Sequence, residues 1–389
     1  MAALLLAVAL SGAGFLTFLR IGLPMTALQV PTGASVGAIS DLAIDPTRRD
    51  LFSGAVNRVV PFQMLYPASA PGTPLQYLPN AGPQLDAIVT IHGRMSHLLL
   101  GRIGALAAPW TDAAKPSGGG PFPVILYLPG VTGYMQMASF QTVDLASQGF
   151  VVVTLNQPGA VAAAVLPGGK VVAGLTRTEA AALIAPSYRI MGQALPDRFA
   201  RALEPDASIV PWFAADVGPV LDRLAQINAN PSHLLYGMLD LDRVGVMGMS
   251  LGAIVAAQAC ATEPRIDACL MMDAPVPTAV ARAGLRQAAL WISRPKADQR
   301  LERAASGGWS EVEIDAQAAT IDAALSNSPQ GELVQLHGLF HLDFTDLSAL
   351  QPAFGWLGQS GVNGGPVAHR QINQLTRRFF AGAFASPLR

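Results

Sequence analysis

The chain has few cysteines, few charged side chains and almost no net charge. Only two of its 389 residues are cysteines, Cys260 and Cys269, and Lys, Arg, Asp and Glu together make up 13%. Two cysteines in apolar stretches imply neither a metal cluster nor a disulfide framework, so we expect two buried thiols. The 25 basic and 26 acidic side chains nearly cancel, which argues against a nucleic-acid partner.

Hydrophobic residues are abundant instead. They make up 51% of the chain, and the mean hydropathy of +0.37 is high for a freely soluble enzyme. Residues 1–19 carry no charged side chain and are about long enough to cross a bilayer as a helix. We therefore expect 1–20 to be a membrane-anchor or signal-like segment that makes the protein membrane-associated.

The side of the membrane stays open. No basic group precedes the apolar run, which weakens the signal-peptide interpretation. Arg20, Arg48 and Arg49 all follow it, which favours the cytoplasmic side for the rest of the chain. The run could also be a misassigned start, or the end of a longer membrane region.

The remaining sequence predicts a linker and entry region at 21–57 and one catalytic domain at 58–389. Short apolar runs separated by helix-length segments are typical of a mainly parallel sheet with helices on both faces. We predict strands at 59–66, 124–128, 150–155, 244–247, 268–272, 288–292 and 333–336. We predict helices at 138–148, 213–227, 251–261, 311–325 and 367–384, with a weaker helical pattern at 85–106.

One interval breaks this rhythm. The stretch at about 157–212 is rich in Ala, Val, Leu and Pro and is too long for an ordinary connection. Long apolar insertions in compact domains are commonly lids or binding loops. We predict that this one is a cap over the functional site and that it selects the substrate. Its apolar side chains, which include Val161, Val165, Leu183, Ile190, Met191 and Trp212, should line the pocket.

The strongest local motif is Gly-Met-Ser-Leu-Gly at 248–252, a match to G-x-S-x-G. A predicted strand precedes it and a predicted helix follows it. This is the context of a nucleophile elbow, where a serine occupies a sharp turn and small residues such as Gly248 and Gly252 allow close packing. Ser250 is therefore the candidate nucleophile.

A serine hydroxyl needs a base, and the base needs a carboxylate that orients it. Asp273 follows the next predicted strand, at the same edge of the sheet, and fits the chain order serine, acid, histidine. His337 and His341 both follow the last predicted strand. On spacing alone these two histidines are close rivals for the base.

The negative charge that develops during ester attack requires two backbone N–H donors. Leu251, directly after Ser250, should supply one of them. The loop at 129–133 follows the strand at 124–128, and Gly130 there lets the backbone approach a substrate. Val131 is the candidate for the second donor.

These residues resemble the platelet-activating-factor acetylhydrolase family of α/β hydrolases, the plasma-type group and its bacterial relatives. The resemblance runs from about Pro31 through most of the chain and includes the segments 31–33, 65–68, 144–150, 216–217 and 220–222. Its most specific parts are the elbow, Asp273, and a His-x-x-Phe-x-Asp pattern at 341–346. By position in that pattern, the resemblance implies that His341 is the base and that Val131 is the second donor.

The chain departs from the family at two loops. Pro129 and Gly130 stand where the family usually has His-Gly, and the segment 156–159 replaces a charged His-Arg-Asp run. The first departure changes the support of the backbone donor, and the second alters the expected pocket wall. The resemblance therefore implies carboxylic-ester hydrolysis more strongly than hydrolysis of phospholipids.

Together these features predict an α/β-hydrolase fold with an apolar cap insertion and a serine esterase or lipase. The reaction would use an acyl-enzyme intermediate, need no cofactor or metal, and act on a small-molecule or lipid ester, including short-acyl phospholipids. The alternatives are a polyester or dienelactone-type hydrolase, or a catalytically silent module that binds at a membrane.

Overall fold

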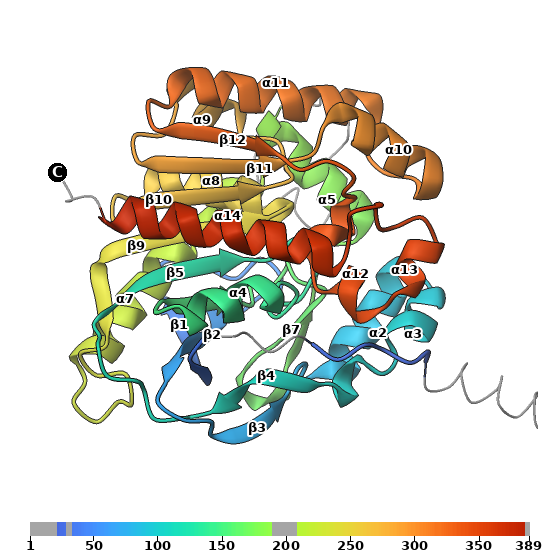
Figure 1. The fold of residues 1–389 in the computed structure, drawn as a ribbon. Coiled ribbons are helices and arrows are strands. Elements are labelled where there is room, and N and C mark those ends of the chain that lie inside the picture. Colours follow the sequence, from blue (N-terminus) through green and yellow to red (C-terminus); the bar gives the residue numbers. More distant parts are fainter. Residues whose placement is uncertain (1–21, 29–32, 189–207, 386–389) are drawn as a thin grey trace, which may run out of the picture.

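The computed structural model describes residues 22–28, 33–188 and 208–385, and its centre is a ten-stranded sheet (Figure 1). The strands lie in the order β12-β11-β10-β9-β5-β6-β2-β1-β4-β3. Their bounds are β1 Ser35–Asp45, β2 Arg58–Ala68, β3 Thr73–Gln76, β4 Ala107–Asp112, β5 Phe122–Leu128, β6 Val151–Leu155, β9 Leu239–Met249, β10 Ala268–Met272, β11 Ala288–Ser293 and β12 Gly331–Gln335.

The half of the sheet from β12 to β6 is entirely parallel, and β2 then pairs antiparallel with both β6 and β1. All residues of β5, β6 and β10 are buried, as expected of strands covered on both faces. Alternate residues of β5 enter different cores: Val124 and Leu126 face one, Ile125 and Tyr127 the other. The predicted mainly parallel α/β architecture is confirmed.

Helices cover both faces of this sheet. Figure 1 shows α4 (Ser139–Ser147) and α14 (Pro366–Ala385) in front of the strands and α8 (Leu251–Thr262) behind them. The core on the α4 and α14 side also receives α2 Ala81–His92, α3 Met95–Leu100, α12 Leu347–Leu350 and α13 Ala353–Trp356. The core on the α8 side receives α5 Arg177–Ile184, α6 Val210–Ala214, α7 Val217–Ala229, α9 Thr278–Ala283 and part of α11 Glu311–Asn327.

Two sequence predictions are corrected here. The region 21–57, expected to be a linker and entry region, contains β1, which pairs with β2 along all of its eleven residues. The helix predicted at 213–227 is two helices, because α6 ends at Ala214 and α7 begins at Val217. Pro219 explains the break, since its ring would clash with the carbonyl of Ala215 in a continuous helix.

The insertion at 157–212 has regular structure of its own. β7 (Ala163–Val165) and β8 (Val171–Ala173) form a separate two-stranded sheet, and α5 follows. A capping box starts α5, because the Thr176 hydroxyl accepts from the Glu179 N–H while the Glu179 carboxylate accepts from Thr176. Ile190 and Met191, expected to line the pocket, lie outside the described residues.

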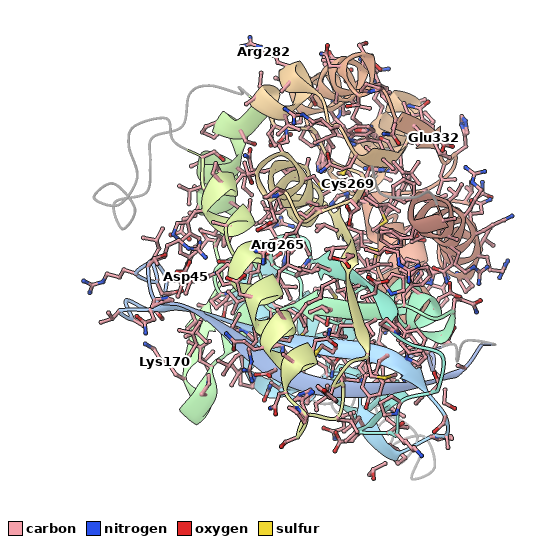
Figure 2. The ribbon with its side chains drawn as sticks, turned by 90° about the vertical axis from the view of Figure 1, so that its left-hand side faces the viewer. Asp45, Lys170, Arg265, Cys269, Arg282 and Glu332 are labelled. Carbon is pink, nitrogen blue, oxygen red and sulfur yellow. A yellow bond between two sulfur atoms is a disulfide. The ribbon has the colours of Figure 1, made fainter. Side chains whose placement is uncertain are left out.

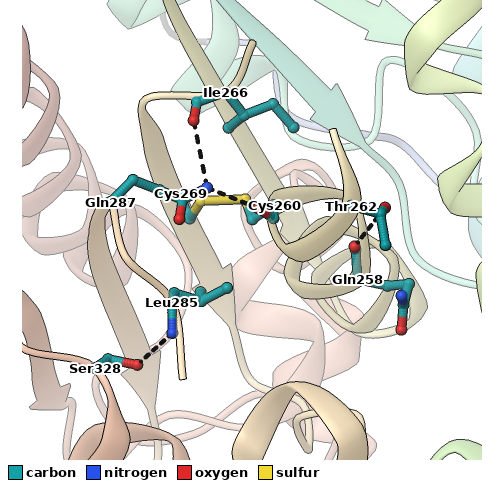
Figure 3. Close-up of a disulfide and its surroundings, with 8 residues drawn as sticks. All are labelled: Gln258, Cys260, Thr262, Ile266, Cys269, Leu285, Gln287 and Ser328. Carbon is teal, nitrogen blue, oxygen red and sulfur yellow. Dashed lines mark hydrogen bonds between the residues drawn. A yellow bond between two sulfur atoms is a disulfide. The ribbon is translucent and has the colours of Figure 1, made fainter. Parts of the chain in front are cut away.

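Cys260 and Cys269 form a disulfide, so the prediction of two free thiols is wrong. Figure 3 shows the bond, which joins the end of α8 to strand β10. The Cα atoms of the two cysteines lie 6.4 Å apart. Both cysteines are buried as expected. In Figure 2, Cys269 lies among packed side chains, whereas Lys170 and Arg282 extend outward.

No helix within the described parts of the chain is both long and apolar enough to cross a membrane. The segment 1–20, on which the predicted membrane association depends, lies outside those parts. The described helices therefore give that prediction no support.

Candidate active site

Ser250 stands on the tight turn between β9 and α8. Its backbone has φ 56° and ψ −124°, a conformation that costs energy for any residue with a side chain. The Ser250 N–H donates to the carbonyl of Met272 at the end of β10, 3.0 Å away. The strained turn at the carboxyl end of a parallel strand is the geometry predicted for a nucleophile elbow.

The two elbow glycines are required by close packing. A Cβ on Gly248 would overlap the carbonyl of Gly252, and a Cβ on Gly252 would overlap the carbonyl of Leu128 in β5. Any larger side chain would push α8 away from the sheet. This explains in physical terms why the motif has glycine on both sides of Ser250.

Three neighbouring strands end within one residue of the same register position, and each is followed by a polar residue. Met249 of β9 pairs with Met272 of β10, which pairs with Ile292 of β11. Ser250 and Asp273 follow the first two strands directly, and Arg294 follows Ser293 at the end of β11. The expectation that Ser250 and Asp273 share one edge of the sheet is therefore met.

Asp273 is 1% exposed and is surrounded by donors. Arg294 donates to its Oδ2 from Nε at 2.9 Å and from a terminal nitrogen at 2.8 Å, and Gln317 approaches Oδ1 at 3.4 Å. Burial by itself raises the pKa of Asp273, but the Arg294 charge and the hydrogen bond with His341 outweigh it and hold the pKa well below its ordinary value. The carboxylate is thus ionised and fixed in position.

His341 lies against that carboxylate. Its Nδ1 is 2.6 Å from Oδ2 of Asp273, so Nε2 is left for another partner, and 22% of the side chain is exposed. His337 is exposed, and its carbonyl accepts from Asn363. Of the two rivals, His341 is the one in contact with Asp273.

A second acid fixes the loop that carries His341. Glu302, on α10 (Lys296–Ser306), accepts from the His341 N–H at 3.1 Å through Oε1. Its other carboxylate oxygen, Oε2, accepts a hydrogen bond from a terminal nitrogen of Arg294 at 2.5 Å. Arg294 is buried, yet Asp273 and Glu302 outweigh the effect of burial and raise the pKa of the guanidinium. Arg294 therefore connects the side chain of Asp273 to the backbone of His341.

The two predicted backbone donors are both available. In the described chain no carbonyl accepts from the N–H of Val131 or of Leu251. Both residues line a pocket with Ser250. The Val131 loop is held by the Thr132 N–H, which donates to the Ala160 carbonyl at 2.8 Å, and Gly130 packs tightly against Ser250.

The pocket above Ser250 has a volume of about 140 Å³. The insertion contributes Ala180, Ala181 and Ile184 from α5, followed by Tyr188. The lining also includes Trp309 and Glu313, which lie before and within the first turn of α11. A cavity of similar size holds one benzene ring, so a short acyl chain or a single ring fits.

The segment 156–159, expected to alter the pocket wall, is not part of that lining. It packs beside a buried ion-pair cluster instead. The Pro158 carbonyl accepts from Arg58 at 2.9 Å, and Gln157 donates to Asp216, which also pairs with Arg58. Trp212, expected to line the pocket, lies over the Arg58 guanidinium in the same cluster.

Sequence reasoning missed Arg294, Glu302, Trp309 and Glu313. Arg294 follows a buried strand in the same way as Ser250 and Asp273, and that position was an available signal. The other three lie in helical or loop sequence. Nothing local marks Glu302 or Trp309 as part of a site, and the Ser-x-x-Glu pattern at 310–313 indicates only a helix cap.

Comparison with solved structures supports the architecture. A ferulic acid esterase from Streptomyces cinnamoneus is similar over 93% of this chain and 92% of its own, with a TM-score of 0.64 and 19% identity. A protein named as a dienelactone hydrolase from Klebsiella pneumoniae covers 88% of this chain and 98% of its own, with a TM-score of 0.42 and 13% identity. The chain has the α/β-hydrolase fold.

The sequence comparisons found no counterpart. No family model matches the chain, and no curated protein is similar to it in sequence. The resemblance to the platelet-activating-factor acetylhydrolase family therefore stays a prediction.

Proposed function

We propose that this protein is a serine esterase that hydrolyses carboxylic esters with a short acyl chain or a single-ring acyl group. One observation carries the proposal. The Asp273–His341 hydrogen bond of 2.6 Å lies at the sheet edge that also presents Ser250 in its strained turn. Such an acid–base pair beside a serine is the arrangement that activates a hydroxyl nucleophile.

In the proposed mechanism, His341 accepts the proton of Ser250 while the Ser250 oxygen attacks the ester carbonyl. Asp273 holds the imidazole tautomer that makes this possible and stabilises the imidazolium that forms. The N–H groups of Leu251 and Val131 donate to the oxyanion. His341 then gives its proton to the leaving alcohol.

Water completes the cycle. It attacks the acyl-enzyme as His341 removes its proton, and the carboxylic acid is released as Ser250 regains a proton. No residue outside this set has to supply a proton. The proposal includes short-acyl phospholipids only as one class of ester, since the pocket accommodates a short chain whatever the alcohol.

The decisive experiment compares wild type with Ser250→Ala on p-nitrophenyl esters of increasing acyl length. We expect kcat/KM to fall by about 10⁴-fold or more, because losing a triad member removes most of the acceleration. Circular dichroism should be unchanged. A variant that keeps a substantial part of the activity would refute the role of Ser250.

A fluorophosphonate probe separates the enzyme from a silent binding module of the same fold. A working Ser–His pair makes the serine hydroxyl nucleophilic. Wild type should therefore be labelled and Ser250→Ala should not. Folded wild type that resists the probe would favour the binding module.

A further inference from the structure

Glu313 is the only charged side chain among the described residues that line the Ser250 pocket. The remaining lining consists of apolar side chains together with Ser250, Tyr188 and Trp309. A carboxylate in a pocket where an oxyanion develops opposes the build-up of negative charge. Its presence there calls for an explanation.

Capping of α11 explains only part of why Glu313 stands in the pocket. Oε2 of Glu313 accepts from the N–H and the hydroxyl of Ser310, both at 2.7 Å, and completes a capping box. Glutamine serves equally well at this position of a capping box, so the helix does not require a charge. Oε1 has no hydrogen-bond partner within the described parts of the chain.

The neighbouring acids of α11 are neutralised, and Glu313 is not. Glu311 pairs with Arg300 and Arg303 of α10, and Asp315 pairs with Lys296 at 2.6 Å. No Lys or Arg of the described chain lies within ion-pair distance of Glu313. Its negative charge therefore faces a pocket whose described lining holds no cation.

Two aromatic residues share this end of the pocket. The ring centroid of Trp309 lies 5.4 Å from that of His341, and Tyr188 lines the pocket as well. Burial, together with the charge of Glu313, raises the pKa of Tyr188 to about 12, as expected when hydroxyl and carboxylate are close. Aromatic rings beside a carboxylate are the combination that binds organic ammonium groups.

We propose that the pocket selects esters that carry an organic ammonium group, held by Glu313, Trp309 and Tyr188. The inference rests on the proposed esterase function and names its substrate class. A cationic substrate would neutralise Glu313 and so remove its opposition to the oxyanion. A neutral substrate of the same shape would leave that opposition in place.

The test uses pairs of esters that differ only in charge. One pair is acetylcholine and 3,3-dimethylbutyl acetate, which vary the alcohol. The other is the p-nitrophenyl ester of 4-(trimethylammonio)butyrate and that of 5,5-dimethylhexanoate, which vary the acyl group. In at least one pair, we expect wild type to favour the cationic ester by about tenfold in kcat/KM at low salt, and less at high salt.

Glu313→Gln removes the charge and keeps the capping box. The ratio of kcat/KM between the cationic and the neutral ester should therefore fall to about the value expected for a pocket without a charged side chain. Glu311→Gln is the matched control, because Glu311 is on the same helical turn but outside the pocket, and it should keep the preference. Equal rates within both pairs for wild type would overturn the inference. A preference that survives Glu313→Gln would do the same.

Binding separates this inference from the esterase proposal. Calorimetry on Ser250→Ala should show choline binding about tenfold more tightly than 3,3-dimethylbutan-1-ol, and Glu313→Gln in that background should abolish the difference. If wild type hydrolysed no ester but this difference appeared, the esterase proposal would fail and the ammonium site would stand. If hydrolysis depended on Ser250 but neither rates nor binding followed charge, only the ammonium site would fail.

Discussion

The contact between His341 and Asp273 separates two histidines that spacing alone left equal. His337 is four residues earlier but exposed, and Asp273 is buried behind His341. A carboxylate that fixes the tautomer of a histidine and stabilises its imidazolium makes it an effective base, so contact with Asp273 favours His341.

We therefore predict that His341→Ala loses about as much ester hydrolysis as Ser250→Ala, on the order of 10⁴-fold or more. His337→Ala should stay within a few-fold of wild type. Steady-state kinetics on p-nitrophenyl acetate measures both. An essential His337 would mean that the loop adopts another arrangement in the working enzyme.

Arg294 is predicted to be a positioning residue for the same pair. Arg294→Met leaves the buried carboxylate of Asp273 without its cation, and breaking a buried pair costs about 3–5 kcal/mol of unfolding free energy. Arg378→Met is the control, because Arg378 forms an exposed pair with Glu332 and should change stability by less than about 1 kcal/mol. Denaturant unfolding at pH 7 gives both values.

The loss of unfolding free energy in Arg294→Met should depend on pH in a defined direction. The pKa of Asp273 in the folded wild type lies below its unfolded value, so this group stabilises the protein above about pH 4, and that stability is lost as the pH falls. Without Arg294, burial raises the pKa of Asp273. The stability difference between wild type and Arg294→Met should therefore be largest near neutral pH and shrink in acid. In the pH profile of kcat/KM, the acid limb of Arg294→Met should lie at higher pH than that of wild type. A difference independent of pH would indicate that Arg294 contributes only packing.

At the scale of elements, α5 is one part of the insertion that reaches the pocket. Ala181 is exposed on α5 and lines the space above Ser250. Both Ala and Leu are good helix formers, so Ala181→Leu should fold normally while it fills part of the pocket.

This variant should lose activity on long acyl chains more than on acetate. Each methylene kept out of the pocket costs about 0.8 kcal/mol, or roughly fourfold in kcat/KM. Ala381→Leu makes the same change at an exposed position of α14, on the other face of the sheet, and should leave the length profile unchanged. An equal fall for all chain lengths would show that the insertion supports folding without selecting the acyl group.

The elements that the sequence predicted best are those whose own residues decide their structure. The strands β5, β6 and β10 are buried on both faces, so each is a short apolar run that predicts a strand from its own residues. β1 was missed because Gly37, Ser40 and Asp41 interrupt any apolar pattern. Its eleven residues are held by pairing with β2, and pairing partners are not visible in a local window.

The site divides in the same way. Ser250, Gly248 and Gly252 belong to a contiguous motif whose strand and helix can be recognised locally. The environment of Asp273 depends on contacts with Arg294, Gln317 and His341, which the sequence separates by 21, 44 and 68 residues. Candidate residues could therefore be named, but the network that fixes them required the fold.

For the molecule as a whole, the disulfide changes the expected chemistry of the chain. It links α8, which begins after Ser250, to β10, which ends before Asp273. Disulfides persist mainly in oxidising compartments, whereas Arg20, Arg48 and Arg49, which follow the apolar run at 1–19, favoured the cytoplasmic side. These two indications disagree, and the state of the cysteines can be measured directly.

We predict that thiol titration of the denatured protein detects no free thiol without reductant and two after reduction. The Cys260→Ala, Cys269→Ala double variant should lose about 2–3 kcal/mol of unfolding free energy, because a cross-link that closes a short loop restricts the unfolded chain. Its kcat/KM should stay near that of wild type, since Ser250 remains bonded to the Met272 carbonyl and Asp273 to Arg294. Two reactive thiols in the unreduced protein would show that the cysteines are not joined. A large loss of activity at unchanged stability would show instead that the cross-link sets the distance between nucleophile and acid.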